Sequence, residues 1–211
     1  VEEQIVIDQI SLLEWIKGVI TFGTLRFDTT IFRASFTAKK NNDENFFKEI
    51  NKISFAYRSS KEIALESVAQ GRAFLNSILS VWENRVFKEW VLNFKKEGYN
   101  PDYTVVLGVT ACIFKIPLKQ ALLAFINSFV SNLISAGIRL IPLGQNEGLR
   151  IICELENEII QTLEDSLKRN LEDYGTSSFN ADLHSSKHET QYSRLFKSPI
   201  WAGKGQEREF A

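Results

Sequence analysis

The sequence predicts an all-α fold, a single-domain, bundle-like array of about eight helices followed by a C-terminal tail. Apolar residues recur at the spacing of one helix face through most of the chain before Tyr174. No segment alternates apolar and polar residues for long enough to predict a strand. The stretch 116–148 adds a long apolar helix that stops at a proline and turns into another helix.

The elements before residue 116 are bounded by capping residues and loops. Asp8 or Ser11 can cap a first helix. The charged run 39–45 has no apolar residue and predicts a loop. The predicted helices of this half run from Asp8 to Ile20, over about 25–39, over 46–57, from Ser59 or Ser60 to Leu79, over about 82–96, and from Asp102 or Thr104 to 116.

Gly71 lies in the middle of the fourth of these helices, where glycine costs roughly 1 kcal/mol relative to alanine. A close helix crossing is the expected reason for it. A ligand contact at Gly71 and Arg72 is the alternative.

The segment 116–141 carries bulky apolar residues over about half of its circumference, so we expect a helix that is buried on most sides. Its remaining arc carries small residues and a narrow polar stripe, formed by Ser128, Asn132, Ser135 and Arg139. Small residues let another backbone approach, and buried polar groups need partners. The stripe therefore predicts a second packing surface.

Beyond the proline, leucine and isoleucine recur at helical spacing over 148–171 and predict one amphipathic helix of about six turns. From Tyr174 the composition changes to serine, glycine and asparagine. We therefore divide the chain into a helical domain at 1–173, a partner-binding tail at 174–198 and an extra, disordered C-terminus at 199–211.

Charge and composition favour a soluble protein with a protein or small-molecule partner. The net charge is −1 with basic and acidic residues interspersed, so no field favours nucleic acid or an anionic membrane. No uninterrupted apolar run reaches the length of a membrane span, and no signal sequence opens the chain. Cys112 and Cys153 both lie in apolar runs and are expected to be core residues in a reducing, cytoplasmic setting.

No catalytic set is recognisable. Phosphate-binding glycine loops and the common hydrolase, zinc-protease and kinase motifs are absent. His184 and His188, followed by Glu189, could offer metal ligands on one helix face, but they lie in a serine-rich segment. We therefore expect no enzyme, no bound cofactor and no preformed metal site, and favour a binding or scaffolding role.

The tail supplies a stronger indication of a partner. Tyr192, Leu195 and Phe196 share one helix face beside Arg194, and aromatic residues with arginine are typical interface anchors. Docking of the tail onto the chain's own core is the alternative interpretation.

Four blocks resemble the family of the urease accessory protein UreF. They are QGRAFL at 70–75, LGVTACIFKIPLKQALLAF at 107–125, SNLISAGIRLIPLGQNEG at 131–148 and HETQYSRLFKS at 188–198. The last two are the most specific. The resemblance extends from near the first residue to Ser198.

The resemblance implies a cytoplasmic, all-helical, non-catalytic scaffold or chaperone for metallocentre assembly, dimeric in the family. With an accessory protein called UreD or UreH, it would recruit the GTPase UreG for nickel insertion into apo-urease. The turn that the third block implies consists of Arg139, Pro142, Leu143, Gly144 and Gln145. The partner contacts that the fourth block implies are His188, Glu189, Gln191, Tyr192, Ser193, Arg194, Leu195 and Phe196.

Two alternative roles remain open. The chain could regulate the GTPase directly, with Arg139 or Arg194 near the nucleotide phosphates. It could instead bind and carry nickel cations through His184, His188 and a cysteine. Two departures from the family are also expected: its N-terminal apolar segment is missing before Val1, and 199–211 is an addition.

Overall fold

The computed structural model describes residues 5–58 and 60–173, and this part of the chain is all-α, as predicted. It contains nine α-helices, a 3-10 turn and no strand. The helices are α1 (Gln9–Phe22), α2 (Thr24–Asn41), α3 (Glu44–Ala56), α4 (Lys61–Val81), α5 (Arg85–Lys96), α6 (Tyr103–Ile113), α7 (Leu118–Leu140), α8 (Gln145–Glu154) and α9 (Glu156–Lys168), and the 3-10 turn is η1 (Leu171–Asp173).

Side-chain caps fix where several helices begin. Asp8 caps α1 by accepting the backbone N–H of Ser11 at 2.8 Å, and the Ser11 hydroxyl in turn accepts the N–H of Asp8 at 3.0 Å. Asp102 caps α6 through the N–H of Thr104 at 3.1 Å. These capping positions agree with the sequence prediction.

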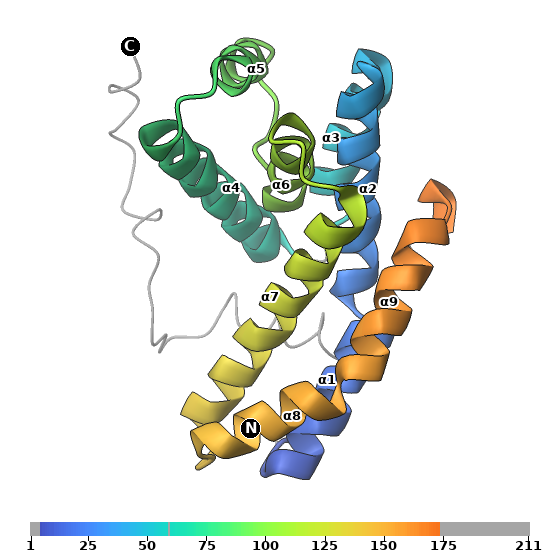
Figure 1. The fold of residues 1–211 in the computed structure, drawn as a ribbon, viewed down its shortest axis with the longest axis vertical. Coiled ribbons are helices and arrows are strands. Elements are labelled where there is room, and N and C mark those ends of the chain that lie inside the picture. The colour runs from blue at the N-terminus through green and yellow to red at the C-terminus, as the bar shows by residue number, and fades with distance from the viewer. Residues whose placement is uncertain (1–4, 59, 174–211) are drawn as a thin grey trace.

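Two hydrophobic clusters form the interior, and α2 contributes to both. The first cluster lies where α1, α7, α8 and α9 meet, in the lower half of Figure 1. The second lies among α3, α4, α5 and α6 in the upper half. Leu25 and Phe32 of α2 belong to the first cluster, and Phe27 and Ile31 to the second.

The helices of the upper half approach one another closely at two glycines. A Cβ at Gly108 of α6 would overlap the Phe32 carbonyl of α2, so glycine permits this extensive helix contact. A Cβ at Gly71 of α4 would overlap the carbonyl oxygen of Pro101, just before α6. A close backbone approach is therefore the reason for Gly71, as expected, although the backbone that it meets lies just before α6 and not within a helix.

The single helix predicted over 148–171 is wrong: the segment forms α8 and α9, which meet at Leu155. The N–H of Leu155 is shared between the carbonyls of Ile151 and Ile152, at 3.0 and 3.2 Å. The bend keeps both helices on the core, because Ile151, Leu155 and Ile159 are all buried. A straight helix could not cross the end of α7 and then follow α1 and α2, as α8 and α9 do (Figure 1).

The C-terminal end of α9 is tied back to α2 by arginine side chains. Arg33 of α2 donates to the carbonyls of Leu167, at 2.8 Å, and of Arg169. Arg169 donates to the carbonyl of Arg26 at 3.1 Å. The two bonds from Arg33 satisfy carbonyls that the end of α9 leaves free.

By length and composition, α7 could cross a membrane. However, Leu122, Ile126, Val130 and Ile134 along one side of α7 are nearly or fully buried in the first cluster. Core helices of soluble proteins have the same length and composition. One side of α7 therefore packs in the interior of the described part, as a core helix does.

Candidate partner-binding site

The exposed side of α7 carries the polar stripe. Ser128, Asn132, Ser135 and Arg139 are all exposed, and so is Ala124 on the same side. The expectation that α7 is buried on most sides is wrong, because within the described residues no helix covers this face. The periodicity located the stripe correctly, but it could not reveal that the second surface is open.

The stripe ends at an exposed corner between α7 and α8. Ile141 is 4% exposed and Leu143 is half-buried against the first cluster, so these two side chains hold the corner on the core. Pro142, Gly144 and Gln145 between and after them face solvent.

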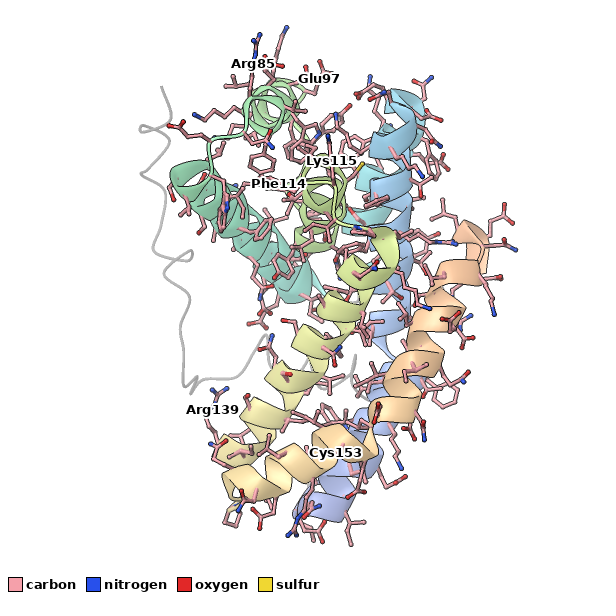
Figure 2. The ribbon with its side chains drawn as sticks, in the orientation of Figure 1. Arg85, Glu97, Phe114, Lys115, Arg139 and Cys153 are labelled. Carbon is pink, nitrogen blue, oxygen red and sulfur yellow. The ribbon has the colours of Figure 1, made fainter. Side chains whose placement is uncertain are left out.

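The corner is tight because small residues lie at the crossing. A Cβ on Gly148 of α8 would come within 2.5 Å of the Ile138 side chain of α7. Arg139, on the last turn of α7, points away from the neighbouring helices in Figure 2. The five predicted turn residues therefore lie at or beside this exposed corner, and of the five only the Leu143 side chain packs against the core.

A groove of about 580 Å³ lies next to the stripe. Its lining residues come from α4, α6 and α7, with α2 at its floor. Ser128 and Asn132 line the groove, whereas Ser135 and Arg139 lie beyond it. Its walls are mostly apolar, with side chains that include Ile63, Phe74, Leu107, Phe125, Phe129 and Leu133.

The floor of the groove is a buried ionic cluster. Arg58, in the link between α3 and α4, donates from Nη1 to Asp28 Oδ1 and from Nη2 to Asp102 Oδ2, each at 2.7 Å. Ser67 Oγ donates to Asp102 Oδ2 at 2.8 Å, and Thr104 Oγ1 donates to Asp28 Oδ1 at 3.2 Å. Every charged group of the cluster is therefore hydrogen-bonded, as burial requires.

Burial and neighbouring charges shift the pKa values of Arg58 and Asp28 in opposite directions. Burial alone would lower the pKa of Arg58, but the carboxylates of Asp28 and Asp102 outweigh it and raise that pKa. Burial raises the pKa of Asp28 above its ordinary value, although Arg58 opposes the shift. Because its charged groups are bonded to one another, the cluster has the arrangement of a structural ion network that joins α2, α4 and α6.

The sequence interpretation missed this cluster as a unit. It identified Asp102 only as a helix cap, and it gave Asp28 and Arg58 no role. An aspartate between the apolar residues Phe27 and Ile31 was the available signal, because a carboxylate on a buried helix face needs a cation.

The two cysteines differ in environment. Cys112 on α6 is half-buried, and burial raises the pKa of its thiol. Cys153 is exposed on α8 (Figure 2), so the expectation of a core residue is wrong there. The buried positions of α8 are Gly148 and Ile151, which leave residue 153 on the outer face.

Within the described residues, no group of three His, Cys, Asp or Glu side chains is arranged to hold a metal ion. The tail residues predicted to bind a partner lie outside the described part of the chain, as do His184 and the candidate metal ligand His188. They remain predictions.

Comparison with known proteins decides the family. The model of the UreF family matches residues 6–156. The chain belongs to the UreF family. The resemblance drawn from the four sequence blocks is thereby confirmed.

Relatives from several bacteria carry the description urease accessory protein UreF. The chain is 36% identical to that of Granulibacter bethesdensis over 198 residues, which is 94% of this chain and 83% of the relative. It is 37% identical to that of Rhodopseudomonas palustris strain BisB18, and 34% to that of Bradyrhizobium diazoefficiens. Both alignments cover 94% of this chain and 81% of the relative. The exposed α7 face and corner are thus features of a UreF-family protein.

Proposed function

We propose that the chain is a non-catalytic scaffold of urease maturation in the cytoplasm. Together with a UreD- or UreH-type protein, it recruits a UreG-type GTPase so that nickel is inserted into apo-urease. Membership of the UreF family, whose relatives are described as urease accessory proteins, is the observation that carries the proposal.

The exposed surface of α7 supports a scaffold. A scaffold must hold part of its surface in place while leaving that surface uncovered by its own helices. Interfaces commonly combine polar groups with apolar anchors. The stripe and corner meet this requirement, because the opposite side of α7 is buried in the first cluster. We assign the part of this face that lies beyond the groove, Ser135, Arg139 and the corner, to protein contacts, including a second copy of the chain in a homodimer.

The tail residues from His188 to Phe196 are proposed as contacts to the UreD-type partner. Apolar and aromatic anchors beside an arginine supply most of the binding energy in many interfaces. Three apolar anchors and Arg194 fall within this short segment.

Co-purification with a UreD-type partner tests the tail. We expect a chain ending at Lys187 to lose the partner, because it lacks the proposed anchors. A matched chain ending at Ser198 should retain it, since only 199–211 is removed. Retention of the partner by the shorter chain would refute the role of the tail.

Direct regulation of the GTPase is a second candidate, favoured by the exposure of Arg139 at the end of α7 (Figure 2). An arginine that contacts nucleotide phosphates changes hydrolysis by orders of magnitude, about 10³-fold or more. GTP hydrolysis by a UreG-type protein should therefore be measured with Arg139→Ala and Arg194→Ala, with the exposed Arg150→Ala as control. Rates equal to those of the unchanged chain would exclude this role.

A further inference from the structure

The walls of the groove between α4, α6 and α7 consist mainly of apolar side chains. Phe74 from α4, Leu107 from α6 and Phe125 and Phe129 from α7 are half-buried and line one continuous depression. Its volume of about 580 Å³ suits several side chains of an inserted segment. Within the described residues, nothing covers it.

The groove is also acidic. Asp28 and Glu66 line it, and Arg58 is the only cation among its described lining residues. The Arg58 side chain is 6% exposed and is engaged by Asp28 and Asp102, so the cluster retains one net negative charge. Glu66 adds a second negative charge at the exposed rim of the groove. Its carboxylate accepts a hydrogen bond from the neutral Gln70 at 3.0 Å. Charge complementarity therefore calls for an occupant that carries both apolar side chains and cations.

We propose that residues 188–198 of the same chain, His-Glu-Thr-Gln-Tyr-Ser-Arg-Leu-Phe-Lys-Ser, dock in this groove when no partner is bound. Tyr192, Leu195 and Phe196 supply the apolar side chains, and Arg194 and Lys197 outnumber the one carboxylate, Glu189, so that the segment is net positive opposite the acidic rim. If the tail also contacts the UreD-type partner, as proposed above, the partner competes with the groove for the same residues.

The intervening chain is long enough for this docking. Residues 174–187 separate the end of η1 from the segment. Fourteen residues span up to about 50 Å when extended. The 23-residue helix α7, the longest in the described part, measures about 35 Å.

Photo-crosslinking of the purified full chain, without any partner, tests the proposal. Phe196 is replaced by p-benzoylphenylalanine, and the crosslinked peptides are identified by mass spectrometry. We expect crosslinks to the groove walls, residues 63–74 of α4 and 120–133 of α7. Crosslinks confined to other surfaces, or none, would overturn the proposal.

Charge reversal makes the test specific. Glu66→Lys should lower the crosslink yield about threefold, as expected for loss and reversal of one rim ion pair. Adding Arg194→Glu to Glu66→Lys should restore the yield. Glu83→Lys, at an exposed acidic position outside the groove lining, should leave it unchanged. An equal response of the Glu66 and Glu83 variants would contradict the assignment.

A mixture of ¹⁴N- and ¹⁵N-labelled chains identifies which copy contributes the tail. Crosslinks within one isotope support docking in the same chain. Mixed-isotope crosslinks would overturn that docking and assign the groove to the tail of a second copy. Because no UreD-type protein is present, this result does not depend on whether the proposed scaffold function is correct.

Discussion

Arg58 joins two carboxylates that come from distant parts of the chain. Asp28 precedes it by 30 residues on α2, and Asp102 follows it by 44 residues at the start of α6. No local pattern links residues so far apart, so the sequence could identify the cap at Asp102 and leave the ion network unseen. The network holds α2, α6 and the start of α4 together beneath the groove.

Replacing Arg58 with methionine should destabilise the protein by about 3–5 kcal/mol, because both buried carboxylates lose their cation. The free energy of unfolding in urea measures the effect. Arg85→Ala, which breaks the exposed pair with Glu89, should change it little. A small loss for Arg58→Met would mean that the cluster is hydrated and not buried as described.

The raised pKa of Asp28 predicts a pH dependence. A carboxyl whose pKa is higher in the folded than in the unfolded protein contributes stability as it becomes protonated. The free energy of unfolding of the unchanged chain, relative to that of Asp28→Asn, should therefore rise as pH falls through the folded pKa toward the ordinary value of 3.8. Paired urea titrations at several pH values test this. The opposite trend would show that the charge of Arg58 dominates over burial.

At the level of helices, two glycines in similar helical positions should respond oppositely to alanine. Gly71→Ala should destabilise the protein, since its Cβ would overlap the Pro101 carbonyl. Gly18→Ala in α1 should stabilise it by about 0.4–1 kcal/mol, because a Cβ there meets nothing within 4 Å and alanine is the better helix former. Thermal unfolding of both variants provides the comparison. Stabilisation by both substitutions would contradict the close approach of α4 to Pro101.

Helical periodicity predicted most elements well, because most described helices bury one stripe and many begin at a side-chain cap, whereas α2 and α6 are buried on most sides. It failed at Leu155, since the buried spacing of Ile151, Leu155 and Ile159 continues unbroken through the bend. It also overestimated the burial of α7. The apolar pattern of a helix shows which of its residues a neighbour could cover, but it does not show whether such a neighbour is present. The groove depends on three helices brought together by the fold, so no single segment predicts it.

For the whole molecule, α2 belongs to both hydrophobic clusters, so we expect the helical part to unfold as one unit. Trp15 lies on α1, which contributes to the first cluster, and Trp90 lies on α5, which contributes to the second. Two chains, one with Trp15 and one with Trp90 as the only one of the four tryptophans left, should show coincident urea transitions by fluorescence. Transitions at clearly different urea concentrations would divide 1–173 into two units.

The scaffold role is tested most directly by nickel loading of apo-urease. Purified apo-urease is incubated with nickel, GTP and the UreD- and UreG-type proteins, with or without the full chain, and the nickel retained by urease is measured after gel filtration. We expect nickel incorporation to depend on the full chain and to be lost with the chain ending at Lys187. Equal incorporation in the absence of the chain would contradict the proposed function.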